Sequence, residues 1–254
     1  MSDTRMETRT ESLAVAQGTT SISRPFTIAH ISDLHFGAPA FAPGLMESVA
    51  VQVNELGPDL LVVSGDLTLN GYRKEFVEAK TQIDQISCPN KLIIPGNHDS
   101  ANAGYMHFGD VVGSRLGVYA NDDIVVVGVD STQPDLDDGR VGRSLYDWIR
   151  ESFAGPARLR VFVLHHHILP VPDTGRERNV CYDAGDVVKL LLGCGVDLVL
   201  SGHKHVPYAW NLNGLTVTTA GTACSSRLRG MSGPSYNVIR CQGTSVAVDC
   251  VKSL

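Results

Sequence analysis

Three consecutive histidines, His165, His166 and His167, directly follow the apolar run VFVL at residues 161–164. Imidazole binds transition metals and changes its charge near neutral pH, so it serves often in catalysis. A buried strand has no structural need to end in three imidazoles, and we therefore expect part of this run to do chemistry. Alternate side chains of an extended chain share a face, so His165 and His167 should point one way and His166 the other.

Other side chains that can bind a metal also follow apolar runs. They occur in the segments DLH at 33–35, GD at 65–66, GNHD at 96–99 and GHKH at 202–205. Taken singly, each residue has an ordinary explanation as a cap, a turn residue or a structural histidine. Taken together they do not, because five strand ends would each have to carry such residues by accident.

The mixture of ligand types indicates which metals fit. Carboxylates, imidazoles and one amide oxygen, without thiolates, suit Mn²⁺, Fe or Zn²⁺ and disfavour a structural zinc site. Seven ligands are too many for one ion that keeps positions open for a substrate. Two ions about 3.5–4 Å apart, bridged by one carboxylate, would use the set, clamp a phosphoryl oxygen and convert a bridging water into hydroxide.

The elements that must position these residues are short apolar strands alternating with helices, which is typical of an α/β fold. Strands are predicted at 26–32, 60–65, 91–96, 124–130, 159–165 and 197–202. The carboxyl ends of parallel strands share one edge of a sheet, where ligand sites form. The polar segments should therefore meet in one crevice.

Helical spacing of apolar residues predicts helices near 76–86, 145–153 and 187–193. After residue 205 four short strands follow one another, and Asn213-Gly214 is a strong hairpin signal. This part is predicted to be an antiparallel meander without helices. The Ser- and Thr-rich residues 1–24 are expected to be a disordered tail, and residues 25–254 one domain.

Composition excludes several classes of protein. The net charge of −6 argues against a general nucleic-acid binder, whose surface is basic. The six cysteines have no CxxC spacing, so buried free thiols are expected rather than disulfides or a zinc site. No run resembles a signal peptide or a membrane span, which predicts a cytoplasmic protein without a membrane partner.

The ordered set DLH, GD, GNHD, the histidine at 165 and GHKH resembles the calcineurin-like metallophosphoesterases. The likeness covers residues 33 to 205, and AGT at 220–222 is similar as well. It implies a four-layer αββα sandwich, in which two mixed β-sheets are flanked by helices. It also implies a centre of two divalent ions.

The resemblance further implies a role for each position. The implied ligands are Asp33, His35 and His205 for the first ion, Asn97, His165 and His203 for the second, and Asp66 as the bridge. His98 would lie near the substrate, either as proton donor to the leaving oxygen or as a hydrogen-bonding group on the phosphoryl. For Asp99 only a role in orienting its loop is expected.

Departures from the family pattern narrow the range of substrates that the resemblance implies. Protein Ser/Thr phosphatases carry an Asp-Arg pair soon after GD, whereas this chain reads GDLTLNG. The chain is more similar to bacterial cyclic-nucleotide and glycerophosphodiester phosphodiesterases, although Ile168 follows the histidines where many of these enzymes have proline. The leading hypothesis is hydrolysis of a small phosphodiester, such as a 3′,5′-cyclic nucleotide. The alternatives are a phosphomonoesterase, a nucleotide pyrophosphatase, a nuclease or a non-catalytic scaffold.

Substrate contacts are expected from loops beside the crevice. The candidates are Asn70, Arg176, Arg178, Arg227 and Arg229. Arginine binds phosphate through its forked donors, and solvated loop arginines are the equally weighted alternative. The expected partner is a small phosphate ester, and the oligomeric state is left open, with a homodimer as one option.

Overall fold

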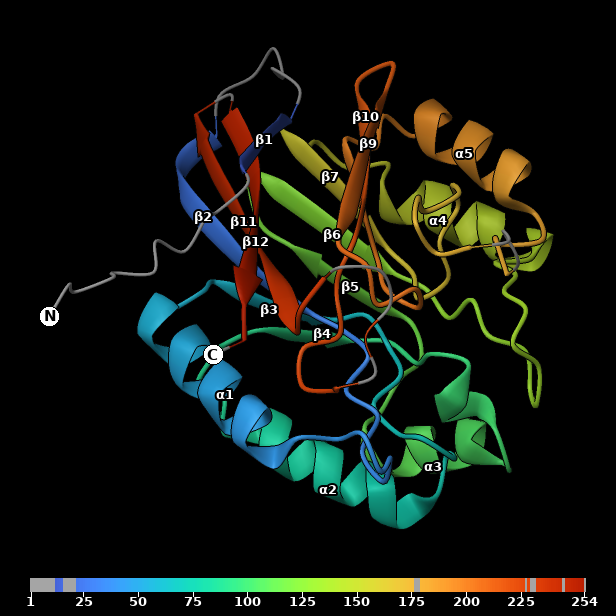
Figure 1. The fold of residues 1–254 in the computed structure, drawn as a ribbon. Coiled ribbons are helices and arrows are strands. Elements are labelled where there is room, and N and C mark those ends of the chain that lie inside the picture. The colour runs from blue at the N-terminus through green and yellow to red at the C-terminus, as the bar shows by residue number, and fades with distance from the viewer. Residues whose placement is uncertain are drawn as a thin grey trace, which may run out of the picture.

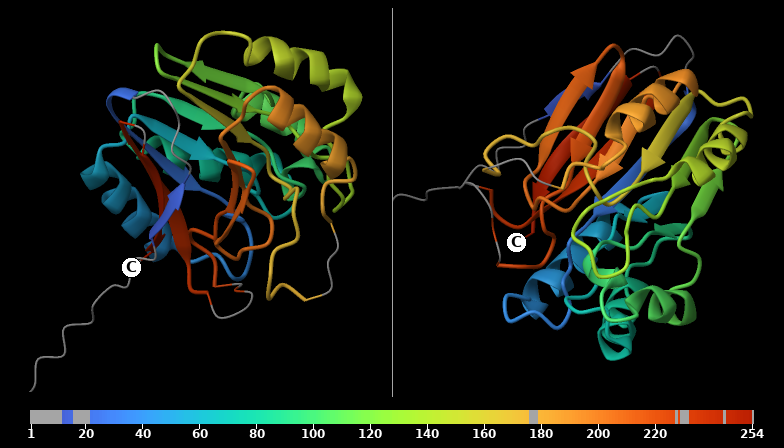
Figure 2. Two further views of the ribbon diagram at one scale, coloured as in Figure 1. Left: turned by 90° about the horizontal axis from the view of Figure 1, so that it is seen from above. Right: turned by 90° about the vertical axis from the view of Figure 1, so that its right-hand side faces the viewer.

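The structure is a computed structural model that describes residues 12–15, 22–175, 179–226, 228, 232–243 and 245–253. Two β-sheets pack face to face, and helices cover the outer face of each (Figures 1 and 2). Both sheets contain parallel and antiparallel pairs. The predicted four-layer αββα sandwich with two mixed sheets is confirmed.

The first sheet has the strand order β1-β12-β11-β2-β3-β4. Its strands are β1 (Ser12–Val15), β2 (Ile22–Ile31), β3 (Leu60–Val63), β4 (Lys91–Ile93), β11 (Ser235–Gly243) and β12 (Ser245–Lys252). Strands β2, β3 and β4 are parallel, and the remaining pairs are antiparallel. The loops after the three parallel strands therefore leave the sheet at one edge.

The second sheet has the order β5-β6-β7-β8-β10-β9. Its strands are β5 (Gly117–Ala120), β6 (Ile124–Gly128), β7 (Leu159–Val163), β8 (Leu198–Ser201), β9 (Tyr208–Leu212) and β10 (Leu215–Thr219). Strands β6, β7, β8 and β10 are parallel, with an antiparallel strand at each side. The six strands predicted before residue 205 all appear.

Five α-helices and two short 3₁₀ turns are described. The helices are α1 (Pro43–Leu56), α2 (Arg73–Asp84), α3 (Gly104–Val111), α4 (Tyr146–Ser152) and α5 (Ala184–Gly193), and the turns are His98–Ser100 and Arg143–Leu145. Helices α1 to α3 pack on the first sheet, and α4 and α5 on the second (Figure 1). None of the described helices is long and apolar enough to cross a membrane.

The alternation of side chains in each strand produces three apolar layers. In β3, Leu61 and Val63 pack toward α1 and α2, whereas Leu60 and Val62 pack between the two sheets. All four are fully buried. This explains why the central strands are continuous apolar runs: each lies between a helix layer and a sheet.

Two expectations differ from the structure. Ser12–Val15, within the predicted tail, forms β1 and pairs with β12, and β2 already begins at Ile22, whereas residues 1–11 and 16–21 lie outside the described residues. The expected C-terminal meander is two separate hairpins, because β9 and β10 join the second sheet and β11 and β12 the first. The first hairpin pairs with β8, the strand that precedes it in sequence, and the second pairs with β2, which is distant in sequence.

Candidate metal centre

The loops that follow β2 and β3 run side by side. The Asp33 amide donates to the carbonyl of Gly65 at 3.0 Å, and the His35 amide donates to the carbonyl of Asp66 at 2.9 Å. These backbone bonds extend the parallel pairing beyond the strands. They bring two motifs, more than 30 residues apart in sequence, to the same edge of the first sheet.

Many of the candidate ligands have a backbone conformation that side chains rarely adopt. Among the candidate ligands, those with φ between 52° and 71° are Asp33, His35, Asp66, His203 and His205. A left-handed conformation of a non-glycine residue is uncommon and clusters at functional sites, where the surrounding structure enforces it. Five such residues in one place indicate that the loops are built to aim these side chains.

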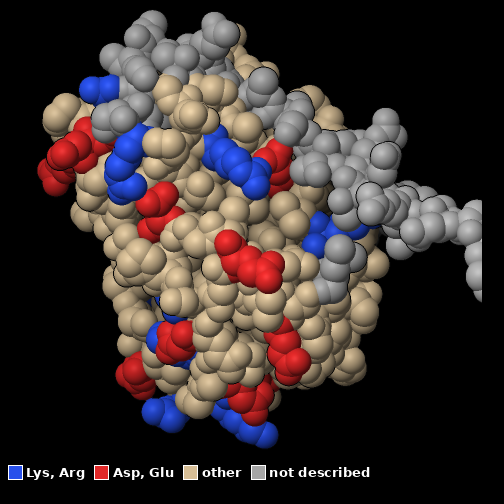
Figure 3. All heavy atoms as spheres, turned by 90° about the vertical axis from the view of Figure 1, so that its left-hand side faces the viewer, with Lys and Arg blue, Asp and Glu red and all other residues tan. Residues whose placement is uncertain are grey.

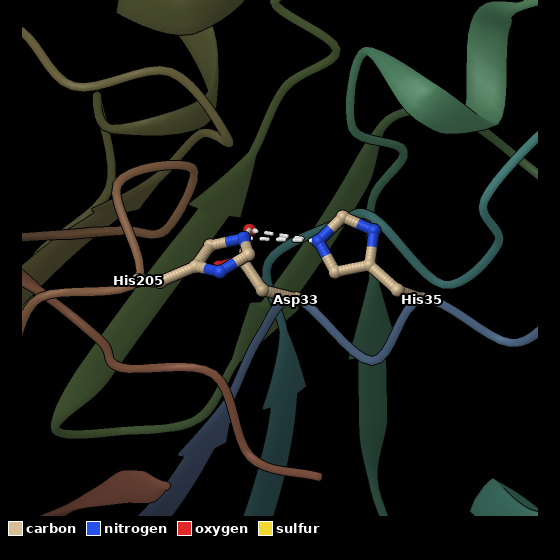
Figure 4. Close-up of side chains that lie close together, drawn as sticks. All are labelled: Asp33, His35 and His205. Carbon is tan, nitrogen blue, oxygen red and sulfur yellow. Dashed lines mark hydrogen bonds and ion pairs between the residues drawn. The ribbon is translucent and has the colours of Figure 1, made fainter. Parts of the chain in front are cut away.

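Asp33, His35 and His205 form one half of the cluster (Figure 4). The Nε2 atoms of His35 and His205 lie 2.9 Å apart, and His205 Nε2 lies 3.3 Å from Asp33 Oδ1. All three side chains are buried. The strands β2 and β8, from different sheets, therefore contribute to one three-ligand group.

Asp66, His165, His203 and Asn97 form the other half. His165 Nε2 lies 3.4 Å from Asp66 Oδ2 and 3.2 Å from Asn97 Oδ1. His203 Nδ1 lies 3.0 Å from the same amide oxygen. Asp66 Oδ2 is also 3.8 Å from His35 Nε2, so this carboxylate stands between the two halves.

The protons on these side chains can be assigned from their partners. His165 Nδ1 is 2.7 Å from the carbonyl of Ser64, which only accepts, so Nδ1 carries the proton. In neutral His165 the lone pair of Nε2 then faces the oxygens of Asp66 and Asn97. Electron-pair donors that converge in this way need a proton or a cation between them, and the donor set therefore fits a metal ion.

Burial and the charges of neighbouring site residues shift the pKa values of His165, Asp66 and His35. Burial lowers the pKa of His165, but the carboxylates of Asp66 and Asp33 outweigh it and raise the value to about 9. Burial raises the pKa of Asp66, but His165 and His98 outweigh it and hold the value well below the usual range. Burial lowers the pKa of His35 to about 4, which keeps this ring neutral and able to bind a metal.

Glycines in the motifs leave space for the carboxylates. A Cβ added to Gly96 would lie 2.2 Å from Asp66 Oδ1, and one added to Gly202 would lie 2.6 Å from Asp33 Oδ2. Both distances are far inside van der Waals contact. The glycines of GNHD and GHKH are therefore required because a carboxylate occupies the volume of their missing side chain.

Asp99 holds two of the loops together. Its carboxylate accepts hydrogen bonds from the amides of Gly96, Leu67 and Thr68 at 2.9–3.0 Å. It is fully buried, and burial together with the charge of Asp66 raises its pKa to about 6. These contacts support the loop-orienting role expected for Asp99. In the AGT segment, the Thr222 hydroxyl likewise donates to the carbonyl of Asp33 at 2.7 Å.

His98 lines the opening above the cluster. Its amide donates to Asp66 Oδ1 at 3.0 Å, and its Nδ1 lies 2.7 Å from the carbonyl of Leu69. Because a carbonyl only accepts, Nδ1 carries a proton, and Nε2 can donate a second proton only when the ring is an imidazolium. The opening is a pocket of about 130 Å³ lined by Asp66, Asn97, His98, Asp137, Asn179, His203 and His205.

The three consecutive histidines lie in three environments, all fully buried. His165 joins the cluster, whereas the His166 nitrogens face Ser131 Oγ at 2.8 Å and the carbonyl of Asp137 at 3.2 Å. The expected alternation of faces is not found, because β7 ends at Val163 and the rings of His165, His166 and His167 all lie close to the ring of His203, with centroids 5.2, 4.8 and 5.7 Å from it. His167 stacks on the ring of His203, with ring centroids 5.7 Å apart, so it lies beside a candidate ligand and away from solvent.

Of the residues that were expected to contact the substrate, the structure describes only Asn70. Asn70 donates its side-chain amide to Glu75 Oε1 at 3.0 Å and does not line the pocket, so within the described chain its contacts stabilise the loop before α2. Arg176, Arg178, Arg227 and Arg229 lie outside the described residues. Their roles stay predictions.

Two pocket residues, Asp137 and Asn179, were not identified from the sequence. Both lie in loops, Asp137 between β6 and α4 and Asn179 between β7 and α5. Neither belongs to a motif, and the acidic stretch DLDD at 135–138 has the composition of a solvated turn. The one sequence feature that could have drawn attention to this loop is Gly139, because a glycine near buried strands can mark a close contact of the backbone.

Comparison with curated proteins gives several relatives. A probable cyclic nucleotide phosphodiesterase of Synechococcus is 27% identical over 187 residues, which cover 70% of this chain and 73% of the relative. The 3′,5′-cyclic adenosine monophosphate phosphodiesterase CpdA of Escherichia coli K12 is 24% identical, covering 65% and 61%. The glycerophosphodiester phosphodiesterase GpdQ of Enterobacter lignolyticus is 28% identical, covering 70% of both chains.

Solved structures with a similar fold include a phosphatase and an anchor protein. Purple acid phosphatase PPD1 from yellow lupin superposes with a TM-score of 0.69 at 18% identity, covering 91% of this chain and about half, 52%, of its own. GAP50, the anchor in the inner membrane complex of Plasmodium, gives 0.66 at 13% identity, covering 90% and 85%. The model of the calcineurin-like phosphoesterases matches residues 26–207, which span the whole cluster, and this chain belongs to that family.

Proposed function

We propose that this protein is a two-metal phosphodiesterase that hydrolyses a small phosphodiester, such as a 3′,5′-cyclic nucleotide. The observation that carries the proposal is the convergence of buried carboxylate, imidazole and amide donors, in two groups that meet at Asp66. Family membership supports the reaction class, and the phosphodiesterase activities for which the relatives are named support a diester substrate.

The residues divide between two ions. Asp33, His35 and His205 would hold the first, Asn97, His165 and His203 would hold the second, and Asp66 would contribute to both. The distances support this division, since the ligand atoms of Asp33, His35 and His205 lie within 4.8 Å of one another, and so do those of Asp66, His165 and His203. His35, Asp66 and His98 form a third group of this kind at the junction of the two. When bound, two such ions supply charge stabilisation and an activated water nucleophile for phosphoryl transfer. Mn²⁺, Fe and Zn²⁺ suit the donor set.

His98, as an imidazolium that carries a proton on Nε2 as well as on Nδ1, is the proposed proton donor to the leaving oxygen. Its ring is held at the pocket by the backbone bond to Asp66 and the Nδ1 bond to Leu69. A donor fixed in this way contributes when the leaving alkoxide is basic, as in a ribose or glycerol ester. The same position also suits a hydrogen bond to a phosphoryl oxygen, so leaving-group dependence separates the two roles.

The charge distribution favours a small substrate over a polynucleotide. Figure 3 shows lysines and arginines interspersed with acidic residues on the face it presents, without a basic patch. With a net charge of −6, electrostatic attraction to a phosphate backbone is weak. A monoesterase, a pyrophosphatase and a nuclease are the alternative activities of the same site.

A non-catalytic metal-binding scaffold is the alternative from another class, and GAP50, the anchor in the inner membrane complex of Plasmodium, has a similar fold. The complete donor set argues for catalysis in this chain, because a scaffold has no need of seven clustered ligands. A scaffold would bind metal without turnover.

The experiment is an assay of metal-loaded protein on cyclic nucleotides, bis-p-nitrophenyl phosphate and p-nitrophenyl phosphate. We expect diester hydrolysis that exceeds monoester hydrolysis. Asp66→Asn should lower both metal content and rate, because one carboxylate oxygen is replaced by an amide nitrogen. Wild-type turnover in metal-loaded Asp66→Asn would contradict the bridging role, and faster monoester hydrolysis would favour the monoesterase.

A cytoplasmic location is also proposed. All six cysteines lie in the described part of the chain, and none is in a disulfide, which fits a reducing compartment. Fractionation of cells that express the protein tests the location, and sedimentation tests whether it forms the homodimer left open by the sequence.

A further inference from the structure

The segment 131–140, between β6 and α4, lies against the second half of the cluster but contributes no proposed ligand. The ring of His166 holds this segment in place through hydrogen bonds. The ring nitrogen Nε2 lies 3.2 Å from the carbonyl of Asp137, and because a carbonyl only accepts, Nε2 carries the proton and donates. Nδ1 then accepts from the Ser131 hydroxyl at 2.8 Å, and the same oxygen accepts from the His166 amide at 3.2 Å.

The segment also packs tightly against the ring. A Cβ added to Gly139 would lie 2.1 Å from Cγ of His166, so the backbone of Gly139 is in direct contact with the imidazole. The Arg140 amide donates to the carbonyl of Ser131 at 2.8 Å and closes the loop. The side-chain Nδ2 of Asn179 also donates to the carbonyl of Asp137, at 3.0 Å. Two donors therefore hold the Asp137 backbone in place.

The side chain of Asp137 reaches a proposed metal ligand. Its Oδ1 lies 3.4 Å from Nδ2 of Asn97. An asparagine amide can present either its oxygen or its NH₂ group to a neighbour, but only the oxygen binds a metal ion. A carboxylate only accepts hydrogen bonds, so Asp137 requires the NH₂ group on its own side. The amide oxygen then faces His165 Nε2 at 3.2 Å and His203 Nδ1 at 3.0 Å.

We propose that Asp137 is a positioning residue, which directs the amide oxygen of Asn97 toward the second metal ion, and that His166 holds Asp137 in place through its backbone. The inference rests on the metal ligands of the proposed function, but not on the substrate. It assigns a role to the middle histidine of the run and to a loop carboxylate, neither of which is a proposed ligand.

The negative charge of Asp137 provides a competing explanation, since any carboxylate near the site attracts cations. Two variants separate the explanations. Asp137→Asn removes the charge but keeps an oxygen that can accept from Asn97, whereas Asp137→Ala removes both. Asp138→Ala is the matched control, because Asp138 is the neighbouring exposed carboxylate of the same loop and does not line the pocket.

The experiment is a calorimetric titration of the metal-stripped proteins with Mn²⁺, together with the metal content after dialysis. Wild-type protein should bind two ions. Asp137→Ala should bind the first with unchanged affinity and the second roughly 10–100-fold more weakly, the range for loss of a residue that orients a ligand. Asp137→Asn and Asp138→Ala should resemble wild type.

Equal affinity of Asp137→Ala and wild type for both ions would overturn the inference. So would an Asp137→Asn variant as weak as Asp137→Ala, since the charge alone would then explain the effect, or an equal loss in Asp138→Ala. Fewer than two ions in wild-type protein would overturn it together with the metal centre. A wild-type protein that binds two ions and hydrolyses no diester would contradict only the proposed function.

Discussion

Each histidine of the run at 165–167 meets a different chemical environment, although all three are fully buried. His165 Nε2 faces both the carboxylate of Asp66 and the amide oxygen of Asn97. His166 has both ring nitrogens in hydrogen bonds to the 131–140 segment. His167 packs against the ring of His203. Identical residues side by side therefore divide into a ligand, a loop anchor and a packing partner.

Replacement of each histidine by alanine tests this division. His165→Ala should lose the second metal ion and nearly all activity, because a ligand is removed. His166→Ala and His167→Ala should keep the ligands but weaken the second ion by roughly 10–100-fold, since they orient Asn97 and His203. Metal content and titration of the three variants provide the measurement. Full occupancy in His165→Ala, with depletion in either neighbour, would show that another imidazole is the ligand.

His98→Ala tests the proposed proton donor. It should retain both metal ions and slow turnover by roughly 10²–10⁴-fold, the range for loss of a general acid. The loss should be smaller for bis-p-nitrophenyl phosphate, whose leaving group needs little protonation. The matched control is His107→Ala, because His107 is also half-buried with Nδ1 3.0 Å from a carbonyl, that of Gly71, but does not line the pocket. An empty metal site in His98→Ala would assign His98 to the ligands.

Among the structural elements, the turns at the carboxyl ends of the strands carry the tightest constraints. A Cβ added to Gly202 would lie 2.0 Å from Ser32 Oγ and 2.6 Å from Asp33 Oδ2. Gly202→Ala should therefore displace Asp33, weaken the first metal ion and lower the free energy of unfolding by about 1–3 kcal/mol, as overpacking does. Thermal unfolding and metal titration provide the measurement.

Gly185→Ala, in α5, is the control for Gly202→Ala. A Cβ there has no neighbour within 4 Å, and alanine is favoured over glycine in a helix, so this variant should be no less stable than wild type. If Gly202→Ala kept wild-type metal affinity and stability, the close packing of the turn against Asp33 would be of no consequence.

Every element that was predicted has a pattern of apolar residues within its own segment of the sequence. The central strands were predicted because continuous apolar runs indicate strands covered on both faces. Helix α1 was not predicted, although Met46, Val49, Ala50 and Val53 have helical spacing and are all buried. The signal for α1 was present in the sequence.

Other features depend on contacts that no local pattern encodes. Ser12–Val15 is too short to indicate a strand, and its partner β12 lies more than 200 residues away. The Asn213-Gly214 turn predicts the hairpin of β9 and β10 but not the sheet that it joins. The same holds for Asp137, whose contact with Asn97 links residues 40 positions apart. Motif spacing identified the residues that end strands, whereas residues that act on them from loops needed the fold.

At the scale of the whole molecule, the proposed ligands are divided between the two sheets. Asp33, His35, Asp66 and Asn97 follow strands of the first sheet, and His165, His203 and His205 follow strands of the second. Each proposed ion has ligands from both sheets. Without a cation, buried carboxylates and imidazoles face one another across the junction. Metal binding should therefore join the sheets as well as supply the chemistry.

Removal of the metal should accordingly affect both activity and stability. Chelation should abolish phosphoesterase activity, and Mn²⁺ should restore it. An ion that binds only the folded state stabilises it by about 2.7 kcal/mol at a concentration 100 times its Kd, so the unfolding temperature should rise on loading. Hydrogen exchange should slow in loops of both sheets, at 33–35 and 65–66 as well as at 165–167 and 202–205, but not along the exposed face of α1. Full activity in metal-stripped protein would exclude a metal-dependent reaction, and protection confined to the loops of one sheet would show that the ions do not join the two.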